Sequence, residues 1–278
     1  VPEGFGETLD AGIAETERVK SKWENEKISV TASTIGITYC EPDQLIELWK
    51  WTDENDRQFD IHAPAVFDQK YLAARRGWEG GSFEWLDHVG ILGPNLIAAH
   101  AQNLRPGEEK LIANAGASIA LVPDMEQVLG LVNFNARPFL DSNITCGIGL
   151  DGAVVAYGHN IWTAMRGYLT AQRMGDQHRL MMSETDIKWT GEEILYGSAE
   201  QALELATIDG AKALMMDDQI GSIEAGKEAD LVLIDRTEES HLTPMGSLIA
   251  SLVYGNGPNQ NAIEAVMVHG EVIVKKGQ

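Results

Sequence analysis

Three side chains that can bind a metal ion lie at or just beyond the C-terminal ends of predicted strands. Asp151 closes the run "ITCGIGLD", His62 lies in "FDIHA", and His100 lies near the end of "NLIAAHA". The C-terminal ends of the strands in a parallel barrel form one face, so we expect two imidazoles and one carboxylate to converge there. These donors suit zinc, iron or manganese.

Each of these residues also has an ordinary structural explanation when taken alone. Asp151 is followed by Gly152, which is typical of a turn. A histidine at the end of a strand is commonly a hydrogen-bonded residue of the core. The occurrence of three such groups in one layer is what favours a metal site. His159, Trp162 and Met165, which follow Asp151, are expected to pack their helix against the barrel rather than to line a pocket.

The elements that would position these residues alternate along the chain. We predict strands at 28–37, 59–63, 95–101, 117–123 and 144–151, and helices at 9–26, 41–57, 106–116 and 135–143. Strands separated by helices of about ten residues predict βαβ units and a parallel sheet. The first strand is not followed by Gly-x-Gly-x-x-Gly, which disfavours a dinucleotide-binding fold. The fold class is therefore α/β, either a (β/α)8 barrel or an open sheet.

The pattern changes near the C-terminus. Residues 200–215 predict a helix, residues 220–236 predict short strands with glycine turns, and residues 262–277 predict a hairpin that turns at His269-Gly270. We expect residues 1–218 to form the barrel portion and residues 219–278 to form a small β-module.

Composition excludes several classes of partner. The 278 residues carry a formal net charge of −21, and nucleic acids and anionic membranes both require a basic surface. No segment is long and apolar enough to span a membrane, and the first residues lack the charge and hydrophobicity of a signal peptide. Cys40 and Cys146 are too few for a disulfide framework, so we expect a cytoplasmic protein. The chain begins without Met, in what looks like the middle of a helix.

Three stretches resemble the amidohydrolase superfamily. "GAKALMMDDQIGSIEAGKEADLVLID" is very similar to the helix-to-strand signature that closes this superfamily, and "GILGPNLIAAHAQNLRPGEEKLIANAGASIALVP" and "GIGLDG" resemble its barrel strands six to eight. The similarity is greatest to the branch that contains S-adenosylhomocysteine, methylthioadenosine and guanine deaminases and triazine hydrolases. It implies part of a (β/α)8 TIM-type barrel with a C-terminal β-module that belongs to a composite β-sandwich.

The same resemblance implies a role for each candidate residue. His62 matches the metal ligand of strand five, and His100 matches the histidine of strand six that orients substrate or water. Asp151 matches the carboxylate of strand eight that binds the metal and acts as the general base. We therefore expect one divalent transition metal, with zinc ahead of iron and manganese. We also expect hydrolysis of a C–N or C–halogen bond in a small molecule, a nitrogen heterocycle.

The sequence also departs from the family. It has no His-x-His pair, and the resemblance begins after barrel strand three. We therefore expect a second chain or a preceding segment to complete the barrel, within a homo- or hetero-oligomer. The glutamate that serves the deaminases as a proton shuttle is Ala65 here, and the histidines of strands four and seven are Ile35 and Leu121. Two alternatives stay open: a non-catalytic scaffold subunit, and a metal-dependent isomerase or lyase.

Overall fold

The chain divides into two compact units. The computed structural model describes residues 7–64, 68–130, 135–156, 158–182, 197–238, 242 and 246–276. The first unit comprises Val1–Ala120 and Phe139–Thr145, and the second comprises Leu121–Pro138 and Cys146–Gln278. This division differs from the predicted boundary at residue 218, which stays a prediction.

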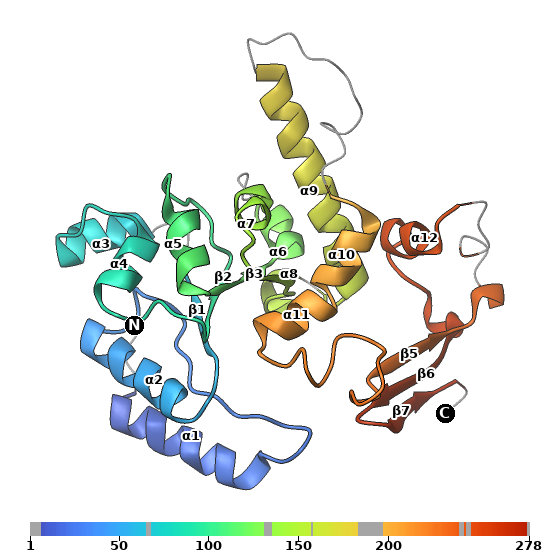
Figure 1. The fold of residues 1–278 in the computed structure, drawn as a ribbon, viewed down its shortest axis with the longest axis horizontal. Coiled ribbons are helices and arrows are strands. Elements are labelled where there is room, and N and C mark those ends of the chain that lie inside the picture. The colour runs from blue at the N-terminus through green and yellow to red at the C-terminus, as the bar shows by residue number, and fades with distance from the viewer. Residues whose placement is uncertain are drawn as a thin grey trace. The chain divides into compact units, whose positions relative to one another are not determined.

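Helices and strands alternate in the first unit, as the sequence predicts (Figure 1). Its elements are α1 (Leu9–Trp23), α2 (Pro42–Glu54), β1 (Phe59–His62), α3 (Asp68–Arg76), α4 (Ser82–His88), β2 (Leu96–Ala99), α5 (Glu108–Ala115) and the start of β3 (Ser118–Leu121); the end of α7 (Arg137–Asp141) also belongs to it. The predicted start of α2 is confirmed: Pro42 opens the helix, and the Glu41 N–H donates to Gln44 Oε1 at 2.9 Å.

The strands of the first unit run parallel. β1 pairs with β2 from Phe59↔Leu96 to His62↔Ala99, and β2 pairs with β3 from Ile97↔Ser118. β4 (Cys146–Ile148) completes the sheet order β1-β2-β3-β4. The predicted parallel sheet is therefore confirmed, and it places His62 at the C-terminal end of its strand.

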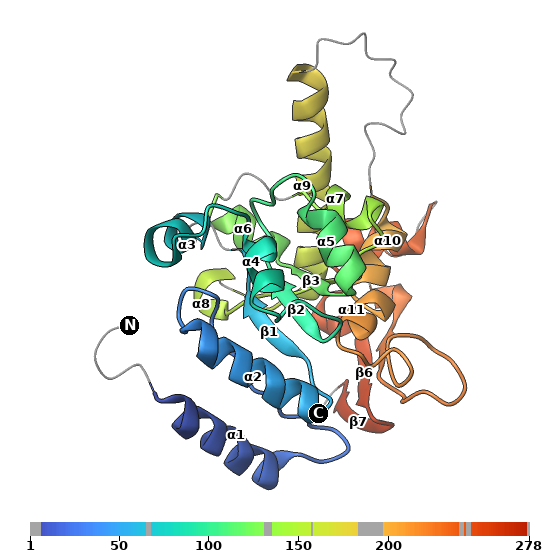
Figure 2. The same cartoon turned by 60° about the vertical axis from the view of Figure 1, so that its left-hand side comes forward.

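Apolar alternation explains how β1 sits in the first unit. Phe59 and Ile61 are buried on one face, whereas Asp60 and His62 point to the other. The ring of Phe59 meets Trp49 of α2 edge-on, with centroids 5.9 Å apart. α2 lies between β1 and α1 (Figure 2), and Trp51 Nε1 donates to Glu17 Oε1 at 2.8 Å to join the two helices.

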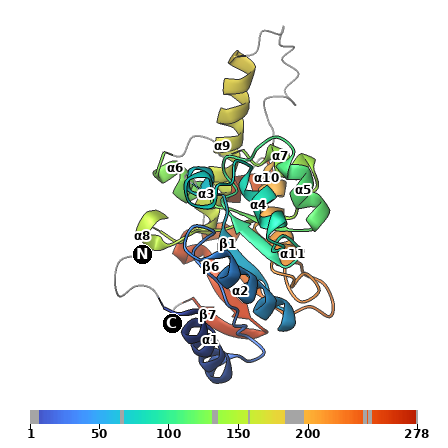
Figure 3. The same cartoon turned by 90° about the vertical axis from the view of Figure 1, so that its left-hand side faces the viewer.

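The second unit holds the remaining helices and a separate antiparallel sheet. Its elements are α6 (Pro123–Val128), α8 (Ala153–Ala156), α9 (Ile161–Met182), α10 (Ala199–Leu205), α11 (Ile208–Ala213), β5 (Leu231–Ile234), η1 (Arg236–Glu238), α12 (Leu248–Tyr254), η3 (Gln260–Ala262), β6 (Ile263–Val268) and β7 (Glu271–Lys275). β6 lies between β5 and β7 in the sheet, and β6 and β7 run side by side in Figure 3. His269 and Gly270 have φ of 51° and 76°, so the predicted hairpin turn is confirmed.

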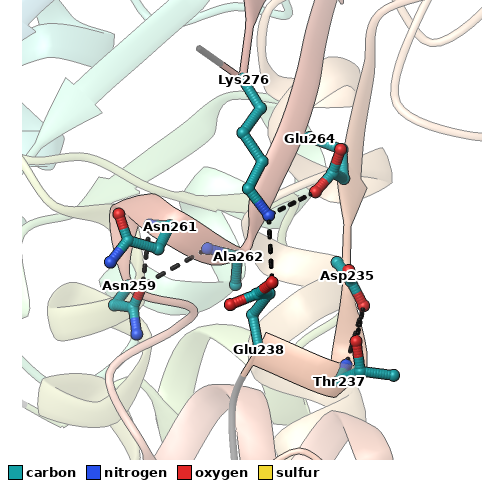
Figure 4. Close-up of polar contacts among 8 residues, drawn as sticks. All are labelled: Asp235, Thr237, Glu238, Asn259, Asn261, Ala262, Glu264 and Lys276. Carbon is teal, nitrogen blue, oxygen red and sulfur yellow. Dashed lines mark hydrogen bonds and ion pairs between the residues drawn. The ribbon is translucent and has the colours of Figure 1, made fainter.

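Polar contacts tie the end of the hairpin to the neighbouring turns. Figure 4 shows that Lys276 contacts Glu264 and Glu238. Its Nζ lies 2.7 Å from Glu264 Oε1 and 3.4 Å from Glu238 Oε1. Asn259 Oδ1 accepts the backbone N–H of Asn261 at 2.7 Å and begins η3. In contrast, β7 itself is exposed along its whole length, including Val272, Ile273 and Val274.

Three local predictions were wrong. Residues 28–37 form no strand. Instead, Thr31 Oγ1 donates to Gln58 O at 2.6 Å, and Ser33 Oγ donates to Asp60 O. Side-chain hydroxyls therefore make hydrogen bonds along this segment that backbone N–H groups would make in a regular strand. Residues 200–215 form two helices, α10 and α11, rather than one. Within 220–236, β5 is the one strand, followed by η1.

Two further observations concern the described residues. Neither cysteine forms a disulfide: Cys146 is buried in β4, and Cys40 is half-buried before α2. No helix in the described part of the chain has the length and apolar character needed to cross a membrane.

Candidate metal centre

One backbone carbonyl holds both the main chain and the ring of His62. The His62 N–H donates to Ile35 O at 3.1 Å, and His62 Nδ1 contacts the same oxygen. A carbonyl oxygen only accepts hydrogen bonds, so Nδ1 carries the ring proton. The lone pair of Nε2 is then free to bind a metal, which is the arrangement that metal-binding histidines commonly adopt.

Gly36 allows this close approach. It forms a parallel bridge with His62, and a Cβ at position 36 would lie 2.9 Å from His62 O and 3.4 Å from His62 Cβ. The segment can therefore reach β1 because residue 36 has no side chain.

His100 lies directly beside His62. It follows the last residue of β2, its N–H donates to Ala120 O at 3.0 Å, and its side chain is buried. The two imidazole rings stack with centroids 4.9 Å apart and an interplanar angle of 28°. A ring nitrogen of one lies within 4.8 Å of a ring nitrogen of the other. The first unit therefore brings together both predicted histidines.

Asp60 is a neighbouring carboxylate that the sequence reasoning missed. It shares a strand face with His62, two residues earlier in β1. Desolvation raises the pKa of Asp60 above its ordinary value, and electrostatic interaction with the His62 and His100 rings opposes that rise. The alternation of β1 could have revealed it, because positions 60 and 62 must face the same way.

Asp151 lies in the second unit, three residues after β4, in a locally fixed conformation. Its φ is 60°, which is uncommon for a residue with a side chain. The Gly152 N–H bonds to Asp151 Oδ1, and His159 Nε2 donates to Asp151 O at 3.0 Å. Met165 is buried as predicted, but His159 is exposed, so the prediction that His159 packs its helix was wrong. Its bond to Asp151 draws it to the loop instead.

The positions that depart from the family also differ in their surroundings. Ile35 is exposed, whereas Leu121 is fully buried in β3. Ala65 lies outside the described residues.

A cavity of about 570 Å³ lies in the first unit, beside this site. Its walls come from α1, from residues 32–40 and from α2, and they include Thr16, Ile35, Tyr39 and Leu48. Ile35 also provides the carbonyl that holds His62, so the cavity wall and the histidine site share one residue.

The comparisons with known proteins identify the family. The sequence profile of the amidohydrolase family matches residues 5–273. The chain belongs to the amidohydrolase family. A 5-methylthioadenosine/S-adenosylhomocysteine deaminase from Desulforamulus reducens is 22% identical over 274 residues, which cover 98% of this chain and 59% of the deaminase.

Two solved structures share the fold. A zinc-bound adenosine deaminase from Xanthomonas campestris matches 99% of this chain with a TM-score of 0.83 and 21% identity. A zinc complex of atrazine chlorohydrolase from Arthrobacter aurescens TC1 also matches 99%, with a TM-score of 0.85 and 21% identity. The chain spans 59% and 58% of these two proteins, respectively. The predicted family and the α/β fold with a parallel sheet are confirmed.

Proposed function

We propose that this chain is part of a metal-dependent hydrolase that acts on a C–N or C–halogen bond of a small nitrogen heterocycle. The observation that carries the proposal is the stacked pair of His62 and His100, with the His62 ring proton held at Nδ1 by Ile35 O. Family membership supports it, as do relatives named for deamination of S-adenosylhomocysteine and for dechlorination of atrazine. The same relatives are enzymes, so a non-catalytic scaffold is not favoured.

The donor groups fit a divalent transition metal. His62 Nε2 and the Asp151 carboxylate would hold the ion, because the family resemblance matches them to its metal ligands on strands five and eight; His62 ends β1, and Asp151 lies three residues after β4. Zinc is the first choice, because imidazole and carboxylate are its usual ligands and two similar structures contain it; iron or manganese would accept the same donors. When bound, the metal would supply an activated water at neutral pH.

The protein side chains would then divide the proton transfers. Asp151 would accept the proton of the attacking water, and the fixed backbone around it would keep the carboxylate oriented. His100 would hydrogen-bond to the reacting group of the substrate from its buried position beside His62.

Ala65, which replaces the glutamate of the deaminases, limits which leaving groups the site could release. A positioned acid contributes about 10²–10⁴-fold to a rate, and alanine cannot protonate a departing ammonia. We therefore favour a substrate whose leaving group needs little protonation, such as chloride, or a proton donor from another residue.

We further propose that another segment or chain completes a (β/α)8 barrel formed in part by residues 1–218, within a cytoplasmic oligomer. The same completion would give residues 219–278 the second half of a β-sandwich. Two observations support it: the chain spans 59% of its deaminase relative, and Val232, Leu233 and Ile273 leave apolar surface exposed on the sheet β5-β6-β7.

The experiment is a zinc-loaded turnover assay with S-adenosylhomocysteine and atrazine, read as released ammonia or chloride, with native mass spectrometry of the same sample. Asp151→Asn should reduce turnover by about 10²–10⁴-fold and leave the circular dichroism spectrum unchanged. The exposed Asp218→Asn is the matched control. Equal turnover by Asp151→Asn and the wild type would remove Asp151 from the mechanism. Absence of both products from a zinc-loaded assembly would refute this hydrolase proposal.

A further inference from the structure

The loop that carries His100 has an unusual backbone. Residues 100–107 join β2 to α5, and His100, Ala101 and Asn103 have φ of 73°, 49° and 56°. Residues with side chains rarely adopt these values. Contacts with surrounding elements must therefore hold this loop in place.

Glu108 provides such a contact at the far end of the loop. Its side chain is only 1% exposed. Oε1 accepts the N–H groups of Phe83 at 2.7 Å and Glu84 at 3.2 Å, and Oε2 accepts the N–H of Arg105 at 2.7 Å. One oxygen is therefore fixed to the start of α4, and the other is fixed to the loop.

A glycine makes room for this carboxylate. A Cβ at Gly81 would lie 2.2 Å from Glu108 Oε1 and 2.4 Å from its Cδ, so no side chain fits there while Glu108 keeps its place. Gln69 Nε2 also donates to Asn103 O at 3.0 Å, which tethers the middle of the loop. Three contacts thus join the loop to neighbouring elements: His100 N–H joins it to β3, Gln69 joins it to α3, and Glu108 joins it to the start of α4.

We propose that Glu108 is a positioning residue for His100. Its carboxylate fixes the end of the loop, which keeps His100 in the left-handed conformation that lays its ring on His62. The consequence for catalysis rests on the proposed function, whereas the ring geometry does not.

The first test is NMR of the full chain with histidine rings labelled with ¹³C, in which single substitutions assign His62 and His100. In Glu108→Gln, the amide oxygen can still accept the two N–H groups of α4, but the amide nitrogen cannot accept the Arg105 N–H. We expect the His62 and His100 signals to shift and the nuclear Overhauser contact between the two rings to disappear. Glu109→Gln is the matched control, because Glu109 is adjacent and its contact with the N–H of Gly107, at 2.9 Å, stays at the start of α5 and does not reach α4.

Gly81→Ala is the second variant, because it displaces the Glu108 carboxylate without removing its charge. It should produce the same ring shifts, and it decides the question if Glu108→Gln does not fold. Ring signals that stay at their wild-type positions in the folded variant, even with a lower melting temperature, would overturn the proposal.

An activity readout separates the proposal from the proposed function. For an active zinc-loaded protein, Glu108→Gln should reduce kcat by about 10- to 100-fold with unchanged zinc content. If the wild type hydrolyses neither S-adenosylhomocysteine nor atrazine, the proposed function fails, and the ring signals alone still decide the role of Glu108.

Discussion

Replacing Gly36 with alanine should separate the His62 ring from the carbonyl that fixes its proton. The new Cβ would lie 2.9 Å from His62 O, and this oxygen belongs to β1, which is held on its other side by β2. Residues 35–36 are not part of a paired strand, so we expect them, and not β1, to move away from the clash. The hydrogen bond from His62 N–H to Ile35 O is already 3.1 Å long, so a shift of a few tenths of an ångström weakens it markedly.

Loss of the main-chain bond frees residue 35 to move further, and we expect Ile35 O then to leave the ring as well; the upper limit of the effect is the loss of the ring's partner. Removing the group that orients a metal-binding histidine typically costs about 10- to 100-fold in metal affinity. That range corresponds to about 1.4–2.8 kcal/mol. The assay is zinc titration against a chromophoric chelator, with ¹⁵N NMR of the His62 ring to locate its proton.

Gly175→Ala in α9 is the matched control, because a Cβ there meets nothing within 4 Å. It should leave both zinc affinity and the His62 ring signals unchanged. Wild-type zinc affinity in Gly36→Ala, together with an Nδ1-protonated ring, would refute the claim that Ile35 O sets the state of His62.

Three further predictions concern stability and reactivity. Phe59→Ala should destabilise the fold by about 3–5 kcal/mol in urea titration, because Phe59 is fully buried against Trp49; a loss below about 1 kcal/mol would contradict this packing. Burial raises the pKa of the Cys146 thiol, so at pH 8 it carries less thiolate than in the unfolded chain. Iodoacetamide should therefore label Cys40 first and Cys146 only when urea is added, and equal labelling rates in the folded chain would exclude a buried thiol. Lys276→Met should leave the urea midpoint unchanged, because its contacts with Glu238 and Glu264 are exposed ion pairs; a clear drop would show that the network stabilises the hairpin.

Apolar runs between turn residues were sufficient to predict the parallel strands from 59 to 151. Phe59, Ile61 and residues 96–98 are apolar and buried. A short apolar run of this kind predicts a buried strand without knowledge of the elements that pack around it. The error at 28–37 has a physical reason. Thr31 and Ser33 favour extended backbone in either case, but their hydroxyls bond to carbonyls of 58 and 60 in place of a regular ladder.

The site was only partly accessible from the sequence. Strand-end positions predicted that His62 and His100 would meet, and they do. The position of the ring proton on His62 depends on the carbonyl of Ile35, 27 residues earlier. The position of the Glu108 carboxylate depends on the N–H groups of Phe83 and Glu84, 25 and 24 residues earlier. Backbone groups have no sequence signature, so neither contact could be predicted. The proposed reaction came from the resemblance rather than from the residues themselves.

The exposed strand β7 links the acidity of the chain to its tendency to self-associate. Val272, Ile273 and Val274 lie on an edge strand, which is a template for pairing with another chain. A net charge of −21 makes copies of the chain repel one another at neutral pH. Salt shortens the range of that repulsion, and titration toward the isoelectric point near 4.6 abolishes it. We therefore expect high salt or acidic pH to favour edge-to-edge pairing of two hairpins, and low salt at neutral pH to oppose it.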